Sequence, residues 1–124
     1  MNPDIAAIEA MARRYLDALY AGDAAGLAEV FLPSSSLTQV TEGKVATLTR
    51  DAWLERIASR PSSASAGLSR HEHILTIDLV GPTLALVKLK CAAPPRYFTD
   101  LLSCLKVDGR WQVAQKVFMT ETAS

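Results

Sequence analysis

The side chains best suited to chemistry in this 124-residue sequence are a pair of histidines and one lysine within an apolar segment. In His71-Glu72-His73, alternate residues of a strand would share a face, so two imidazoles could converge. No third metal ligand is evident, so we expect no metal site. His73 could instead act as a general base if a carboxylate oriented its ring, and Asp100 is the nearest candidate by residue type.

Lys116 is the second candidate, and it lies between Gln115 and Val117 in the middle of a strand-like segment. A lysine that faces the interior is costly unless it is paired, or unless it holds an anionic or carbonyl-bearing ligand. The alternative is that a bulge or a register slip turns Lys116 outward to solvent. The sequence leaves both arrangements open.

The composition argues against several classes of partner. Thirteen basic residues balance thirteen acidic ones, and a net charge of zero disfavours a nucleic acid or a membrane surface. The sequence has no apolar run near the roughly 20 residues of a membrane span and no signal-peptide pattern. Cys91 and Cys104 have neither disulfide-framework nor metal spacing, so we expect core thiols in a reducing cytoplasm. No glycine-rich phosphate loop is present, and we expect no cofactor.

The first half of the chain predicts three helices and two short strands. A helix begins at Pro3 and closes at Gly22, with apolar residues at helical spacing between them. Asp23 caps a short second helix that extends through Phe31 and is stopped by Pro33. Short strands at 37–40 and 45–48 follow, and then a third helix that opens at Thr49 and ends before Pro61.

The second half predicts four strands separated by turn signals. They cover residues 70–80, 84–91, 97–107 and 110–119, and Asp108-Gly109 is a strong two-residue hairpin signal. Helices followed by an antiparallel meander indicate an α+β fold, with helices packed on one face of a curled sheet. Residues 1–124 are expected to form a single domain.

Hairpin registers assign these strand residues to faces. A three-residue turn at 81–83 places His73 on the apolar face with Leu75 and Ile77. It is favoured because a two-residue turn would mix lysines with leucines on both faces. In the last hairpin, one face carries Ser103 and Lys116 and the other carries Asp100, Gln115 and Trp111. Either of these faces could point inward. Both are substantially apolar, which predicts a second buried surface, most simply a dimer interface.

The order of elements resembles the nuclear transport factor 2-like superfamily, and its branch known as putative lumazine-binding and polyketide cyclase-like is the best match. The matching features are Tyr15, Gly22-Asp23, Phe31, Trp53-Leu54, Phe98-Thr99-Asp100, Leu102-Ser103, the stretch from Leu105 to Trp111, and Lys116-Val117-Phe118. The resemblance implies a cystatin-like, cone-shaped α+β barrel with a cavity between the sheet and the helices. It also implies a homodimer formed through the outer sheet face.

Ketosteroid isomerase shares this fold, and its front end is similar around Tyr15. The resemblance places Tyr15 where that enzyme keeps an oxyanion-hole tyrosine. Gln39 stands at the position of the general base and cannot take a proton, while Ser103 or Leu101 is nearest the position of its protonated aspartate. Isomerase activity is therefore disfavoured, and Tyr15 is either a pocket hydroxyl or a core tyrosine.

We therefore predict a domain that binds a small hydrophobic or aromatic molecule in a cavity with a few polar anchors. The candidate anchors are Tyr15, Gln39, His73, Ser103 and Lys116, and the candidate walls are Trp53 and Phe118. One alternative is a lyase or isomerase in which His73 or Tyr15 transfers a proton. The other is a dimerisation module that binds no ligand.

Overall fold

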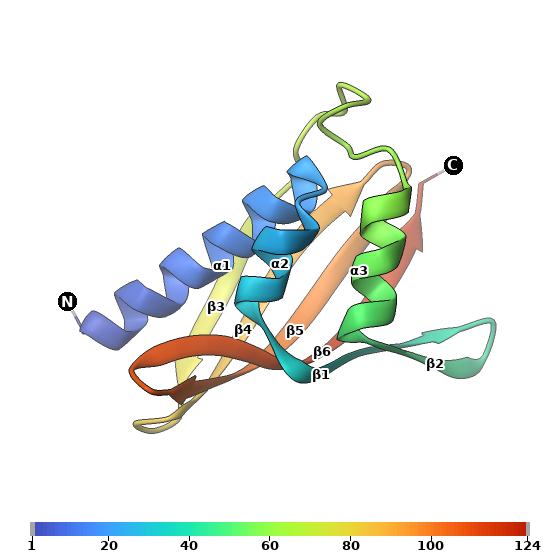
Figure 1. Cartoon of the computed structure of the whole chain (residues 1–124). Helices are drawn as coiled ribbons and strands as arrows, with labels where there is room; N and C mark the ends of the chain where they lie inside the picture. The colour runs from blue at the N-terminus through green and yellow to red at the C-terminus, as the bar shows by residue number, and fades with distance from the viewer. Residues whose placement is uncertain (1, 124) are drawn as a thin grey trace.

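The computed structural model describes residues 2–123, which form three helices packed on one face of a curled sheet (Figure 1). The helices are α1 (Pro3–Ala21), α2 (Ala24–Val30) and α3 (Arg50–Ser59). The strands are β1 (Phe31–Thr41), β2 (Lys44–Thr49), β3 (His73–Leu79), β4 (Leu84–Ala93), β5 (Arg96–Val107) and β6 (Arg110–Thr122). The predicted α+β architecture is confirmed.

The helix ends form where polar side chains and a glycine satisfy the backbone. The Asn2 side chain accepts a hydrogen bond from the Asp4 amide, and Gly22 closes α1 in the left-handed conformation at φ 68°. Asp23 caps α2 by accepting from the Gly26 amide at 3.0 Å. Thr49 caps α3 by accepting from the Ala52 amide at 3.1 Å.

The second helix is shorter than predicted. It ends at Val30, and Phe31 begins a strand that contains Pro33. The pairing of β1 with β6 is interrupted between Phe31 and Ser36, so Pro33 occupies a stretch where no ladder hydrogen bond is required of it. The predicted end at Phe31 is wrong by one residue, and Pro33 lies inside β1 and does not stop the helix.

The six strands form one sheet in the order β2-β1-β6-β5-β4-β3. All neighbouring strands run antiparallel except β1 and β6, which are parallel and are joined by no hairpin that would impose the opposite direction. The sheet is curled and does not close into a barrel. Helix α1 contacts β3, β4 and β6, whereas α3 contacts β1 and β2, so the helices cover the concave face.

A bulge in β3 reverses the predicted orientation of His73. Leu79 pairs with Ala85 as the three-residue turn predicts, but Ile74 pairs with Leu89 and Thr76 with Lys88, which leaves Leu75 without a partner. One extra residue inverts the alternation of side chains beyond it. His73 therefore lies on the solvent side opposite Lys90, and the prediction that it shares the apolar face is wrong.

A second bulge lies in β6 and decides which residues of the last hairpin point inward. Val107 pairs with Arg110 as predicted, and Cys104 pairs with Val113, but Ser103 pairs with Gln115 and leaves Ala114 unpaired. From Gln115 onward the faces of β6 are exchanged relative to a regular hairpin. The concave face consequently takes members of both predicted sets.

The N-terminal turn of α1 is attached to the last hairpin by a carboxylate. Asp4 accepts hydrogen bonds from Lys106 Nζ at 2.9 Å and from Trp111 Nε1 at 3.1 Å. The hydrogen bond from Lys106 is the largest influence that lowers the pKa of Asp4, and the bond from Trp111 adds to it.

Among residues 2–123, no helix is long and apolar enough to cross a membrane.

Candidate functional site

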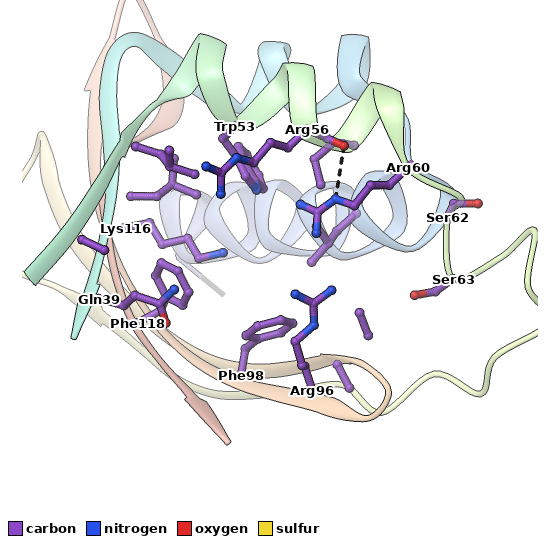
Figure 2. A pocket seen from close by; sticks show the side chains of 18 of the residues that line it. Gln39, Trp53, Arg56, Arg60, Ser62, Ser63, Arg96, Phe98, Lys116 and Phe118 are labelled. Carbon is purple, nitrogen blue, oxygen red and sulfur yellow. Dashed lines mark hydrogen bonds between the residues drawn. The ribbon is translucent and has the colours of Figure 1, made fainter. Parts of the chain in front are cut away.

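A cavity of about 500 Å³ lies between α3, the segment that follows it, and the curled end of the sheet (Figure 2). Its large apolar lining side chains come from α1, α3, β1, β2, β5 and β6: Leu19, Leu37, Leu48, Trp53, Ile57, Phe98 and Phe118. Its uncharged polar lining residues are Gln39, Thr41, Thr47, Ser62 and Ser63. Its charged lining residues are Arg56, Arg60, Arg96 and Lys116. An apolar cavity with a few polar groups is the usual form of a small-molecule site.

A chain of three buried polar side chains lies at the floor of this cavity. Lys116 Nζ donates to the Tyr15 hydroxyl at 2.8 Å, and that hydroxyl donates to Asp100 Oδ2 at 2.5 Å. Lys116 Nζ is also 3.5 Å from Asp100 Oδ2, which makes an ion pair. Tyr15 and Asp100 are completely buried and Lys116 is 5% exposed, so solvent screens this pair little.

The direction of these hydrogen bonds determines what Tyr15 can do. Burial, and after it the charge of Asp100, raises the pKa of Tyr15 well above its ordinary value. The phenol is therefore neutral at physiological pH, and its single proton is used by Asp100. Tyr15 lies beneath the cavity and is not among its lining residues, so its donor is directed away from any ligand.

Lys116 is the cationic group that faces the cavity from below. Its ammonium lies over three aromatic rings, at 5.4 Å from the centroid of Tyr15, 5.2 Å from Trp53 and 4.6 Å from Phe118. Aromatic faces stabilise a cation at this range and partly replace the water that burial removes. An ammonium carries three N–H donors and one is given to Tyr15, so Lys116 can also donate to a ligand.

The other predicted site residues separate into two groups. Gln39, Trp53 and Phe118 line the cavity together with Lys116. Ser103 lies on the outer side of β5, opposite Gln115, because Asp100, Leu102 and Cys104 take the inner positions. His73 lines a separate hollow with His71, whose ring meets Tyr97 edge to face at 5.5 Å. Neither Ser103 nor His73 is therefore among the residues that line this cavity.

The bulge at Ala114 explains why Asp100 and Lys116 meet although they were predicted on opposite faces. Leu102 pairs directly with Lys116, and Asp100 pairs with Phe118, so all four side chains lie on the concave side. Sequence reasoning did not identify Arg56, Arg60 and Arg96, which line the cavity. No local signal marked them, because Arg60 follows the end of α3 and Arg96 lies at the start of β5, far from both in the sequence.

The two thiols are buried, and burial keeps them protonated. Cys91 Sγ lies 3.8 Å from Asp100 Oδ2, and burial, followed by the charge of Asp100, raises its pKa to about 12. Burial raises the pKa of Cys104 to about 12 as well. Both are therefore protonated at neutral pH and are poor nucleophiles.

Within residues 2–123, no group of three or more His, Cys, Asp or Glu side chains is arranged to hold a metal ion.

The sequence and the fold are similar to known proteins. A family model described as "Putative lumazine-binding" matches residues 3–119. The chain is similar to the aldolase FrzH of Cladobotryum sp., with 25% identity over 114 residues that cover 90% of this chain and 87% of that protein.

Two solved structures establish the fold relationship. A nuclear transport factor 2-like protein of unknown function from Silicibacter pomeroyi has a TM-score of 0.84 at 24% identity, covering 95% of this chain and 96% of that chain. A ketosteroid isomerase-like protein from Erwinia carotovora has a TM-score of 0.77 at 18% identity, covering 99% of this chain and 100% of that chain. The fold is therefore nuclear transport factor 2-like.

The coupling between Asp100 and Lys116 can be measured by a double-mutant cycle. We expect Asp100→Asn and Lys116→Met each to lower the free energy of unfolding by about 3 kcal/mol, because each leaves a buried polar partner uncompensated. The double variant should lose less than the sum, by about 1–3 kcal/mol. Urea unfolding followed by tryptophan fluorescence gives these values.

The exposed pair Arg13–Glu9 provides the control for this cycle, since it is an i,i+4 pair on the solvent face of α1. Its cycle should give a coupling of about 0.5 kcal/mol or less. Additive effects of Asp100→Asn and Lys116→Met would contradict the interaction described at the cavity floor.

Proposed function

The chain belongs to the putative lumazine-binding family, and from this premise we propose that its cavity binds a small apolar or aromatic molecule. The observation that carries the proposal is a cavity of about 500 Å³ walled by aromatic and aliphatic side chains, with Lys116 at its floor. Ligand pockets in proteins typically have about 300–1,000 Å³ and a few convergent polar groups. This cavity has both properties.

Two polar groups would orient the ligand. Lys116 retains N–H donors beyond the one that Tyr15 accepts, and these suit a carbonyl or hydroxyl oxygen. The Gln39 side-chain oxygen accepts from Thr120 Oγ1 at 2.8 Å, which leaves the amide NH2 group for a ligand acceptor. Phe98 and Phe118 meet edge to face, with centroids 6.2 Å apart, and form an apolar wall beside these donors.

A second candidate function is a lyase that acts on a carbonyl compound. Among the described residues that line the cavity, none is Asp, Glu or His, and this does not favour proton transfer by His73. The similarity to an aldolase and the presence of Lys116 favour a lyase mechanism in which Lys116 is the nucleophile. In this role, Asp100 would take one proton from the Lys116 ammonium, and the resulting amine would add to the carbonyl carbon. Return of that proton to the departing hydroxyl would release water and leave an iminium that stabilises an adjacent carbanion. Asp100 and Tyr15 would hold the amine in place.

We also propose that the chain forms a homodimer through the outer face of the sheet. Leu101 and Val117 are direct cross-strand partners on that face, and they are 41% and 50% exposed. Met119, two residues along β6, is 53% exposed and extends the same apolar surface. Contiguous apolar side chains on the open face of an antiparallel pair are typical of a surface that is covered by a partner.

Binding can be tested with a neutral aromatic probe, N-phenyl-1-naphthylamine, whose fluorescence rises in an apolar site. We expect saturable binding with one site per chain, and loss of that binding in Ala46→Phe, because Ala46 lines the cavity and the added ring would occupy it. Ala58→Phe is the control, since it adds the same ring to α3 at an exposed position outside the cavity. Equal binding by both variants would contradict the proposal.

The lyase candidate can be tested by trapping. Incubation with a limiting amount of benzaldehyde and sodium borohydride would reduce any iminium to a stable secondary amine. Peptide mapping should place the label on Lys116 ahead of the exposed Lys88 and Lys90. Label distributed evenly among the lysines would remove this candidate and leave the binding proposal intact.

The dimer can be tested by light scattering coupled to size-exclusion chromatography. The wild-type chain should elute with the mass of two chains, and the double variant Leu101→Lys/Val117→Lys should elute with the mass of one, because four charges per dimer would be buried. Val80→Lys is the matched control, because Val80 is 61% exposed and follows the edge strand β3, away from β5 and β6. A monomeric wild-type chain would disprove the dimer.

A further inference from the structure

The charges around the cavity are all of one sign. The charged lining residues are Arg56, Arg60, Arg96 and Lys116, and no Asp or Glu is found among the described lining residues. The whole chain has equal numbers of acidic and basic residues, so this concentration does not reflect a basic protein. A cavity with one sign of charge and low-dielectric walls raises the local concentration of ions of the opposite sign.

The arginines of the cavity differ from most of the arginines elsewhere on the molecule. Arg13, Arg14, Arg50 and Arg70 each form an ion pair, and Arg70 meets both Asp17 and Glu72 at 2.8 Å. Of the four remaining arginines, three line the cavity. Within residues 2–123, no carboxylate lies within 4.0 Å of these three guanidinium groups.

Two of these arginines face one another across the opening. Arg60 follows α3 and Arg96 begins β5, and Figure 2 shows their guanidinium groups approaching from opposite walls, with Arg56 directed inward beside Trp53. Arg60 Nε donates to the Arg56 carbonyl at 3.2 Å, which holds Arg60 against the end of the helix. The three groups are therefore positioned toward a common space.

This arrangement has an electrostatic cost in the absence of an anion. Burial lowers the pKa of Arg60, and the like charges of Arg96 and Arg56 lower it further. Guanidinium groups remain charged in proteins, so the repulsion is not relieved by loss of a proton. An anion placed between them would remove it.

The positive charge at the floor is already balanced, whereas that at the opening is not. Lys116 is paired with Asp100 beneath the cavity, at 3.5 Å. Arg56, Arg60 and Arg96 have no equivalent carboxylate. An acidic group on a ligand would therefore be held at the opening, and the uncharged part would extend toward Trp53, Phe118 and the floor.

We propose that the ligand is an amphipathic organic anion, with a carboxylate, sulfonate or phosphate held by Arg60, Arg96 and Arg56 and an apolar or aromatic body inside the cavity. This inference rests on the proposed binding function and specifies the chemical class of the ligand. Guanidinium groups match such oxyanions in geometry and form strong charge-assisted hydrogen bonds with them.

A pair of probes with one aromatic skeleton tests the acidic group directly. 1-Anilinonaphthalene-8-sulfonate differs from N-phenyl-1-naphthylamine only by its sulfonate. The wild-type chain should bind the sulfonate at least about tenfold more tightly, since two or more charge-assisted contacts are added. That preference should decrease as the salt concentration rises, because the arginines are accessible to solvent.

Arginine variants locate the contact. Arg60→Gln and Arg96→Gln should each remove most of the preference for the sulfonate and leave the affinity for N-phenyl-1-naphthylamine unchanged. Arg13→Gln is the matched control, because it removes the same charge from the exposed face of α1, away from the cavity. An equal loss in Arg13→Gln would show that only net charge matters and would overturn the inference.

The outcomes separate this inference from the function on which it rests. If both probes bind with equal affinity and are excluded by Ala46→Phe, the cavity binds ligands but has no preference for anions, and the inference fails alone. If neither probe binds the wild-type chain, both proposals fail. A sulfonate preference that survives in Arg60→Gln/Arg96→Gln would also overturn the assignment.

Discussion

The cavity depends on one buried interaction, the chain of polar contacts from Lys116 through Tyr15 to Asp100. These residues come from β6, α1 and β5, so their hydrogen bonds of 2.8 and 2.5 Å join the first helix to the two longest strands. A buried ammonium is tolerated only with a compensating charge and hydrogen-bond acceptors in good geometry. Here Asp100 supplies the charge, and three aromatic rings lie next to the ammonium. These groups together form the floor of the cavity.

That interaction exists because the last hairpin is irregular. In an uninterrupted hairpin, Asp100 and Lys116 would lie on opposite faces, and one of the two charges would be exposed. The unpaired Ala114 shifts β6 by one position and brings both to the concave side. Ala114 is a small residue and makes no special demand on the backbone, so nothing in its type marks it as a bulge. The overall fold, the Asp108-Gly109 turn and the helix caps were predictable, because glycines, capping residues and hydrophobic periodicity act locally.

The candidate site was less predictable for the same physical reason. Lys116 was recognisable, since a lysine within an apolar strand must be paired, liganded or turned outward. His73 and Ser103 were misplaced because each orientation depended on a regular register, and one-residue bulges in β3 and β6 changed it. The arginines at the opening were missed because exposed arginines are common. Their significance appears only when α3 and the start of β5 are brought to the same opening and no acid accompanies them.

The two ends of the cavity therefore make different demands on a ligand. At the floor, Asp100 already offsets the charge of Lys116, so a neutral hydrogen-bond acceptor suffices there and a second anion would compete with the carboxylate. At the opening, the guanidinium groups have no carboxylate within ion-pair distance in residues 2–123. An acidic group on the ligand would therefore offset the repulsion between them. Between these ends lie apolar walls that favour a ring. Among residues 2–123, Asp100 offsets Lys116 and no carboxylate offsets the arginines, so the ligand should be acidic at the opening and neutral at the floor.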